Sequence, residues 1–164
     1  MREILFRGKR VDNGEWVEGY YVCTNTYIGS SKLGTKHIIT TGKQTISGAY
    51  GEQQSEGIYT VIPETVGQYT GFEANGKKIF EGDIIQSKLR GRKEEKVYRF
   101  LIKYGSYIPS EYCKEKYSQC KTIGFYAFDG KNDFQLSNCP RVLENIGNIH
   151  DNPELLEADN GTVC

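Results

Sequence analysis

The residue types that nucleophilic catalysis requires are scarce in this sequence. Such catalysis pairs a Ser or Cys with a histidine that accepts its proton, and the chain contains two histidines, His37 and His150. His37 precedes a short apolar run in a region rich in Gly, Ser and Thr, and His150 lies between the last expected strand and an expected helical turn. No catalytic motif accompanies either residue. We interpret His150 as a turn residue and leave a Cys–His pair as an open alternative.

Metal and phosphate chemistry also lacks its usual sequence patterns. Gly42 and Lys43 resemble the end of a phosphate-binding loop, but His37 occupies the position of its first glycine. Gln44 replaces the hydroxyl residue that would hold magnesium. The cysteines show no Cys-x-x-Cys pair of a zinc site; they are Cys23, Cys113, Cys120, Cys139 and Cys164. We therefore expect reduced thiols, no metal, no cofactor and no catalytic activity, and an enzyme of unrecognised type is the third alternative.

An acidic pair is the strongest candidate for a carboxylate site. In the stretch GKKIFEGDII, residues 76–85, Glu81 and Asp83 stand two apart, and such positions on one strand share a face. Two carboxylates on one face could bind a metal or transfer protons. No third ligand or base stands nearby, and the same residues suit a tight corner, with Gly82 at an unusual φ and Asp83 accepting backbone N–H groups. We interpret the stretch as a corner between two strands.

Basic and aromatic residues are concentrated in one segment of a chain that is neutral overall. The sequence holds 21 Lys or Arg and 21 Asp or Glu, whereas residues 86–121 hold ten Lys or Arg and four Glu. Basic groups neutralise phosphates and aromatic rings stack on unpaired bases. The alternative function is therefore a nucleic-acid-binding module that uses the basic, aromatic strip 88–103. Its candidate contacts are Lys88, Arg90, Arg92, Lys93, Arg99 and Lys103. A solvated hairpin tip would explain the same charges.

Turn residues divide the first part of the chain into expected strands. Asp12-Asn13-Gly14 separates two alternating runs, 3–11 and 15–23, and predicts a hairpin. From residue 24 to 56 the composition changes to Gly, Ser, Thr and Gln, with apolar islands at 37–40 and 44–50. This composition indicates short strands joined by mobile loops.

Short strands are also expected in the remainder of the chain. They are predicted over 57–63, 97–104, 122–128 and 141–149, and Asn75-Gly76 predicts a second hairpin. Residues 105–121 fit either a helical turn or a loop, whereas Asn152 before Pro153 predicts a short helix. Short strands separated by Gly-containing turns indicate a mainly β fold, a small barrel or sandwich of antiparallel strands.

Four stretches form a recognisable set: REILFRGKRVDNGEWVEGYYV at 2–22, IPETVGQYTGFEANGKKIFEGDII at 62–85, VLENIGNIHDNPELLE at 142–157 and, in pattern only, VYRFLIKY at 97–104. Together they resemble the YopX family, small proteins typical of phages and prophages of Gram-positive bacteria. The resemblance implies a β-rich fold with a small SH3-like barrel in the C-terminal half, self-association and no established biochemical activity. It supplies no catalytic residue for any position of this sequence.

This resemblance and the strand pattern predict three parts within a single YopX-like unit, 1–164. Residues 1–63 form an N-terminal hairpin and a loop-rich β lobe, residues 64–150 the SH3-like barrel, and residues 151–164 a short helix and tail. Segments 24–56 and 105–121 depart from the family pattern, and we interpret them as insertions.

The apolar and charged residues of the sequence also predict where the protein is located and what it contacts. No window approaches the roughly 18 consecutive apolar residues of a membrane span, and the N-terminus becomes charged before a signal-peptide core can form. We therefore expect a cytoplasmic protein with no membrane partner. Only 37% of the residues are hydrophobic, so subunit burial would add to a lean core. The predicted function is that of a non-catalytic phage or prophage accessory protein, acting by protein binding or self-association. Its expected partners are further copies of itself and an unidentified host or phage protein, with nucleic acid as the alternative.

Overall fold

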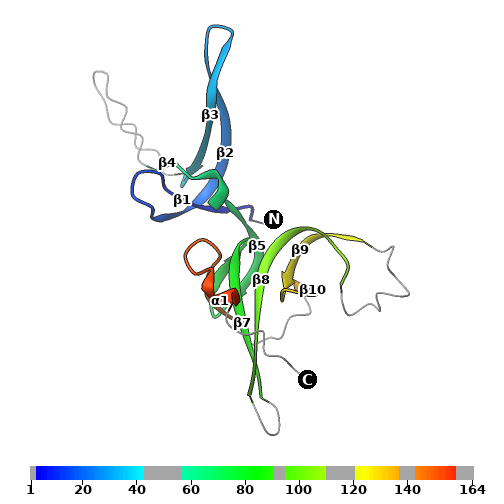
Figure 1. Cartoon of the computed structure of the whole chain (residues 1–164). Helices are drawn as coiled ribbons and strands as arrows, with labels where there is room; N and C mark the ends of the chain where they lie inside the picture. Colours follow the sequence, from blue (N-terminus) through cyan, green and yellow to red (C-terminus); the bar gives the residue numbers. More distant parts are fainter. Residues whose placement is uncertain (1–2, 43–56, 91–94, 110–120, 137–142, 158–164) are drawn as a thin grey trace. The chain divides into compact units, whose positions relative to one another are not determined.

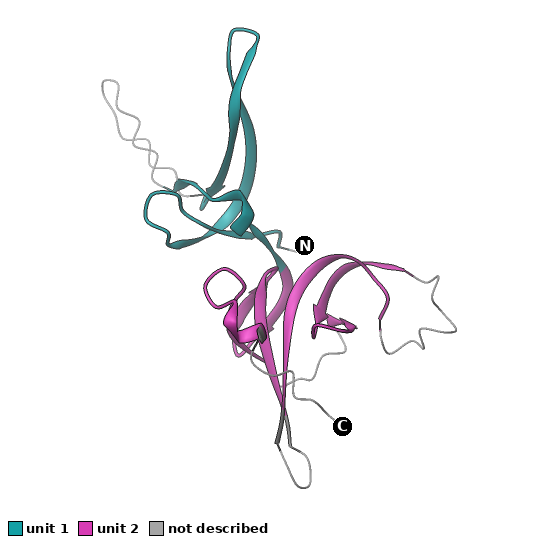
Figure 2. Cartoon of the chain, in the orientation of Figure 1, with its two compact units in different colours: residues 1–69 teal, residues 70–164 magenta. Residues whose placement is uncertain are grey.

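A computed structural model describes residues 3–42, 57–90, 95–109, 121–136 and 143–157 of the 164-residue chain. The chain folds into two compact units, Met1–Tyr69 and Thr70–Cys164 (Figure 2). Within the described residues the strands form two sheets, and all pairings between named strands are antiparallel. The expected mainly β fold is confirmed, while the predicted division into three parts stays a prediction.

The first unit begins with the predicted hairpin. β1 (Phe6–Lys9) pairs with the start of β2 (Trp16–Ile28), from Phe6 opposite Gly19 to Lys9 opposite Trp16. The turn between them is closed by the backbone N–H of Gly14, which donates to the Arg10 carbonyl at 3.0 Å. Gly14 has φ +73°, which a residue without a Cβ adopts at no steric cost. The turn signal in the sequence is therefore confirmed.

A second, longer hairpin replaces the expected loops after residue 24. β2 continues to Ile28 and returns as β3 (Ser31–Thr40), with a ladder from Tyr20 opposite Thr40 to Ile28 opposite Ser31 (Figure 1). The expectation of short strands joined by mobile loops is wrong for residues 24–40. Thr favours extended backbone through its branched Cβ, so this Thr-rich composition supports strands. The apolar island at 44–50 lies outside the described residues.

The first unit closes around a small core. β4 (Ile58–Thr60) pairs with the end of β3, and the short 3-10 helix η1 (Pro63–Thr65) follows. The Thr65 hydroxyl accepts a hydrogen bond from the Lys9 backbone N–H at 2.9 Å and donates to the Ile62 carbonyl at 2.7 Å, which ties η1 to β1. Among the described residues of this unit, the buried apolar side chains are Leu5, Ile39, Val61 and Tyr69.

β5 (Gly67–Ala74) leads from the first unit into the second. Its first residues pair with β1, where Gly67 lies opposite Arg7. Its later residues neighbour β6 (Lys77–Phe80), and the two strands are joined by Asn75 and Gly76 at φ +50° and +72°. Two consecutive positive φ angles are the signature of a type I′ hairpin turn. The second predicted hairpin is therefore also confirmed.

Five antiparallel strands make up the second sheet, in the order β10-β9-β8-β7-β11. Their bounds are β7 (Asp83–Arg90), β8 (Glu95–Tyr107), β9 (Thr122–Phe128), β10 (Asp133–Gln135) and β11 (Leu143–Asn148). β7, β8, β9 and β11 correspond to strands or apolar runs read from the sequence. β10 was not predicted, because three residues are too few to show alternation.

One face of the second sheet carries the core of the second unit. The buried members of this core are Ala74, Ile79, Ile85, Phe100, Ile102, Ala127 and Leu136. Phe100 and Ile102 both point to this core from β8, since residues two apart on a strand share a face. The Phe134 ring of β10 packs edge-on against Phe100, with 5.4 Å between the ring centroids.

The chain described after β11 ends in the predicted helical turn. Residues 149–151 form a turn, and α1 (Glu154–Glu157) follows Asn152 and Pro153. Within the described residues no helix has the length and apolar character needed to cross a membrane. The five-stranded sheet ends at β10 on one side and β11 on the other, and the SH3-like barrel stays a prediction.

Candidate interaction site

The acidic pair at the end of β6 lies at a corner of the fold. Glu81 and Gly82 form the turn, with Gly82 at φ +85°, and Asp83 begins β7 with no exposed surface. The Asp83 Oδ2 atom accepts hydrogen bonds from the Phe80 backbone N–H at 2.9 Å and from Asn145 Nδ2 at 2.8 Å. Its carboxylate therefore stabilises the turn and pins β11 beside it. The interpretation as a corner is confirmed.

The turn after β11 covers this corner. The Ile149 N–H donates to the Gly82 carbonyl at 2.9 Å, and the Gly82 N–H donates to the Ile102 carbonyl, also at 2.9 Å. His150 lies exposed in the same turn, where its backbone N–H donates to Asn148 Oδ1 at 2.9 Å. His150 is thus the predicted turn residue, and two of the quoted sequence stretches, 62–85 and 142–157, meet at this corner. Within the described ranges no three His, Cys, Asp or Glu side chains gather as metal ligands would.

The structure places three of the six candidate nucleic-acid contacts on one face of the second sheet. Lys88 is exposed on β7 opposite Val97 of β8, and Arg99 and Lys103 follow Val97 on the same face by alternation. Arg90 is the last residue of β7, and the side chains beyond Lys88 on this strand are not described. Arg92 and Lys93 lie outside the described residues.

Two of these basic groups make contacts within the second unit. The Arg99 Nη1 atom donates to the Leu155 carbonyl of α1 at 3.2 Å, which holds the helical turn against β8. The Lys103 ammonium lies 4.8 Å from the ring centroid of Phe128, within the range of a cation–π contact. Both groups therefore have a structural role, and their role in binding nucleic acid stays a prediction.

His37, the other histidine, lies close to a cysteine in the structure. Cys23 and His37 are opposite one another in the β2–β3 ladder, and the Tyr21 hydroxyl shares a hydrogen bond with His37 Nδ1. The Tyr21 ring also packs against Phe6 of β1, with centroids 5.4 Å apart. Burial, followed by the nearby Cys23 thiol, raises the pKa of Tyr21 above its ordinary value. Because His37 Nδ1 is bonded to the phenol, the cluster anchors the place where β2 and β3 leave the sheet.

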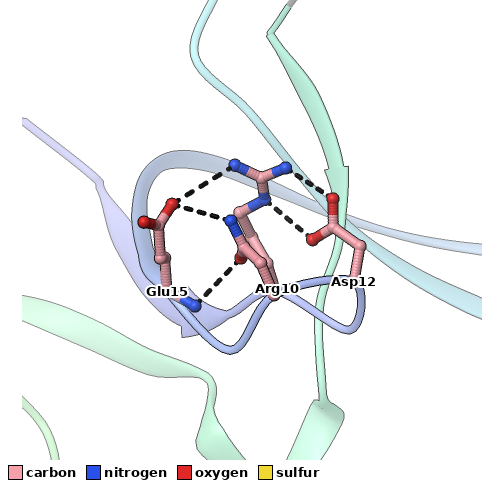
Figure 3. A network of polar contacts seen from close by, with 4 residues as sticks. Arg10, Asp12 and Glu15 are labelled. Carbon is pink, nitrogen blue, oxygen red and sulfur yellow. Dashed lines mark hydrogen bonds and ion pairs between the residues drawn. The ribbon is translucent and has the colours of Figure 1, made fainter.

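Charged residues stabilise the turn between β1 and β2. Arg10 forms an ion pair with Asp12, and its Nη1 atom lies 3.7 Å from Glu15 Oε2 (Figure 3). The Arg10 guanidinium also stands 4.4 Å from the ring centroid of Tyr59. The hydrogen bond from Arg10 lowers the pKa of the Asp12 carboxyl. These contacts join the turn to β4 and keep the base of the second hairpin in place.

The outer part of the β2–β3 hairpin extends beyond its neighbouring strands (Figure 1). β1 pairs with β2 only as far as Gly19, and β4 pairs with β3 only from Ile38 onward. We call residues 20–37 the arm. Within the part of the chain that is described, the two strands of the arm pair only with each other, apart from the His37 carbonyl at the base, which accepts the Val61 N–H at 2.9 Å. A two-stranded hairpin is marginally stable in water unless something packs against it, so the arm is a candidate for contact with a partner.

Large apolar side chains are exposed along the arm. Residues 22–36 are exposed, apart from half-buried Gly34. Five large apolar residues of the arm are between 47% and 69% exposed: Tyr20, Val22, Tyr27, Ile28 and Leu33. Tyr27, Ile28 and Leu33 surround the turn at the tip. Apolar side chains that gather in this way mark interaction sites.

The two strands of the arm differ in charge. No Asp or Glu occurs between Glu18 and Glu52, and the lysines of the arm, Lys32 and Lys36, both belong to β3. Residues 20–28 of β2 include no charged residue, Pro or Gly. The arm is therefore apolar and weakly basic, with its charge on one strand.

The arm itself was not predicted from the sequence. Residues 20–28 of β2 are Tyr, Val, Thr and Ile except for Cys23 and Asn25, and Gly29 follows them at φ +57°. A run of aromatic and β-branched residues that ends at a glycine is a hairpin signal. The Gly, Ser and Thr content of the wider segment concealed it.

Comparisons with known proteins match nearly the whole chain. The family model described as YopX protein matches residues 5–157. The crystal structure of protein EF1440 from Enterococcus faecalis is similar with a TM-score of 0.50 and 23% sequence identity, covering 95% of this chain and 99% of that chain. At this identity the similarity concerns the fold alone. No curated protein matches the chain at a significant level.

Proposed function

Because the chain belongs to the YopX family, we propose that it is a non-catalytic accessory protein of a phage or prophage that acts by binding. Its first partner is a second copy of itself, and an unidentified host or phage protein is a further one. The observation that carries this proposal is the arm, a hairpin whose large apolar side chains are exposed at its tip and along its strands.

The energetics of the arm favour association. Fully burying one Val, Leu or Ile side chain stabilises an assembly by about 1.5–3 kcal/mol. The arm offers Val22, Ile28 and Leu33 together with two exposed tyrosines, Tyr20 and Tyr27. These side chains contribute little to the fold of a single chain, because they are already in contact with water. Burial against a partner would supply the packing that a lone hairpin lacks.

The second unit and the location of the protein belong to the same proposal. We propose that the second sheet forms an SH3-like barrel and that the protein is cytoplasmic. A bulge in β11 between Asn145 and Gly147, and Gly105 opposite Gly124 on β8 and β9, support the barrel. Bulges and strand glycines are the devices by which small sheets bend toward closure.

Nucleic acid is a second candidate partner. Lys88, Arg99 and Lys103 share one face of β7 and β8, and positive groups aligned in this way favour a phosphate backbone. A salt-sensitive complex with short DNA or RNA that Lys88→Ala weakens would support this function. Absence of binding at low salt would remove it.

The proposal is tested by the mass of the protein in solution. Size-exclusion chromatography with light scattering over a range of concentrations should give a mass above that of one chain. The double variant Ile28→Ser and Leu33→Ser should shift the mass toward one chain, since it removes two exposed apolar anchors. The matched control is Ile123→Ser, which changes a side chain that is 74% exposed on β9 of the second unit. A wild-type chain that stays monomeric at every concentration would contradict self-association.

A further inference from the structure

We propose that two copies of the chain associate through the open edge of β2 in the arm, with β2 of one copy antiparallel to β2 of the other. This inference rests on the proposed self-association and names the surface that performs it. The product is a four-stranded ribbon in which β2 strands are central and β3 strands are outermost.

Among the described residues, this edge of β2 is not paired with another strand. Residues 20–28 have β3 on one side, while β1 ends opposite Gly19 on the other. Within the described residues no strand continues the ladder beyond that point. A strand edge of this length presents a row of backbone N–H and C=O groups that can pair with another chain.

β2 also lacks the features that protect natural edge strands. Proteins prevent edge-to-edge pairing with lysines, prolines, glycines and bulges. β3 has such features: Lys32 and Lys36, Gly34, and a register shift that leaves Leu33 without an opposite residue. Residues 20–28 of β2 have none of these residue types and are rich in Tyr, Val, Thr and Ile, which favour strands. The arm is thus protected at one edge and open at the other.

The chemistry of this edge identifies the partner as a second copy. A two-fold axis lets the same edge serve both chains, which is the commonest symmetry of homo-oligomers. Because residues 20–28 carry no charge, two such edges meet without like-charge repulsion. Lys32 and Lys36 would lie on the outer strands, where solvent surrounds them. A ladder of this length spans about 30 Å, and Val22 and the exposed tyrosines would pack across it.

The pairing predicts a specific geometry. An antiparallel pair with its two-fold axis near Thr24 brings residues at the centre of the strand opposite their own counterparts. Tyr20 of one copy then lies opposite Ile28 of the other. A thiol near the axis would meet its counterpart, whereas thiols at the two ends of the strand would lie roughly 25 Å apart at about 3.3 Å per residue.

Lysine substitution tests the edge. The double variant Thr24→Lys and Thr26→Lys adds charge to the proposed edge at two exposed positions, so we expect loss of the dimer in light scattering. The matched control is Ser31→Lys and Thr35→Lys, two exposed positions on β3, and it should retain the dimer. Circular dichroism should show that both variants keep the wild-type strand content. A dimer that survives the β2 lysines would overturn the inference while leaving self-association intact.

Disulfide cross-linking tests the geometry independently. In a chain with all five cysteines replaced by serine, single cysteines are introduced at successive positions from 20 to 36 and oxidised. The covalent dimer should be most abundant at the centre of β2 and fall to background at its ends and along β3. A maximum on β3, or equal yields at all positions, would overturn the β2 edge. A wild-type chain that is monomeric throughout would overturn both this inference and the proposed self-association.

Discussion

The corner at residues 81–83 and the arm at residues 20–37 differ in almost every physical respect. At the corner, Asp83 has no exposed surface and its carboxylate is hydrogen-bonded to β6 and to β11. Along the arm, residues 22–36 are exposed except for half-buried Gly34. Two of the stretches that resemble the family, 62–85 and 142–157, meet at the corner, whereas most of the arm lies within residues 24–56, which we interpreted as an insertion from the sequence. The comparison teaches that the motifs at the corner build the fold, whereas the arm leaves large apolar side chains exposed to solvent.

The largest effect expected is at the corner. Asp83→Ala leaves the buried Phe80 N–H and the half-buried Asn145 amide without their acceptor, so we predict a loss of about 3 kcal/mol in the free energy of unfolding. Chemical denaturation measures this change. Glu144→Gln is the control, because Glu144 is an exposed acidic residue on the adjacent strand β11 and should change stability by less than about 0.5 kcal/mol. Equal losses in the free energy of unfolding for the two substitutions would mean that the Asp83 hydrogen bonds contribute no more to stability than an exposed side chain does.

Two glycines, Gly19 beside the base of the arm and Gly34 in its outer part, differ in how much space surrounds them. A Cβ at Gly19 would overlap the Thr40 carbonyl oxygen, whereas a Cβ at Gly34 would meet nothing within 4 Å. Gly19→Ala should therefore destabilise the first unit by about 1–3 kcal/mol, as overpacking does. Gly34→Ala should be nearly neutral. Thermal unfolding of both variants checks the difference. A neutral Gly19→Ala would show that the backbone at Thr40 has room for a Cβ at position 19.

Substitutions in the outer arm should leave the stability of a single chain almost unchanged. Ile28 is 69% exposed, so Ile28→Ser should alter the free energy of unfolding by less than about 0.5 kcal/mol when measured under dilute, monomeric conditions. At higher concentration the same variant should lose stability relative to wild type, because association stabilises the folded chain by mass action. A large loss in the monomer would show that the arm packs within its own chain.

The smallest effect concerns the base of the arm at high pH. Burial raises the pKa of Tyr21 above its ordinary 10.0, so the unfolded chain ionises at lower pH than the folded one. The resulting stability is present below pH 10 and is lost as the pH rises through the raised folded pKa. Tyrosinate absorbance compared between wild type and Tyr21→Phe isolates this titration. A Tyr21 transition at or below pH 10 would show that water reaches the phenol.

Local signals predicted a large part of the fold. Asp12-Asn13-Gly14, Asn75-Gly76 and Gly82-Asp83 were all identified as turns, because their residues tolerate backbone angles that others avoid. Alternation in β8 puts Phe100 and Ile102 on one face, but only the folded sheet shows that this face carries the core. β10 was missed because its three residues make a strand only by pairing with β9. β10 therefore depends on its hydrogen bonds to β9, which the residue pattern of 133–135 does not reveal.

The candidate site was much less predictable. Sequence analysis considered His37 and Cys23 separately, and only the β2–β3 register brings them opposite one another. It grouped Arg99 and Lys103 with the other basic residues, whereas their contacts with Leu155 and Phe128 depend on the folded sheet. A residue type indicates what a side chain can do, but the tertiary environment decides which of its groups remain available.

By itself the sequence determined the family, the mainly β class, and the turns that divide the chain into strands. These properties depend on a few neighbouring residues, whose preferences for φ, ψ and burial act over short distances. The tertiary structure alone decided that β2 and β3 continue beyond β1 and β4, and therefore that Tyr20, Val22 and Ile28 face solvent. The identity of an apolar residue in a strand does not show whether a second layer of the protein covers its side chain or water surrounds it. Exposure depends on where neighbouring strands end, and those ends are set by contacts between residues that are far apart in the chain.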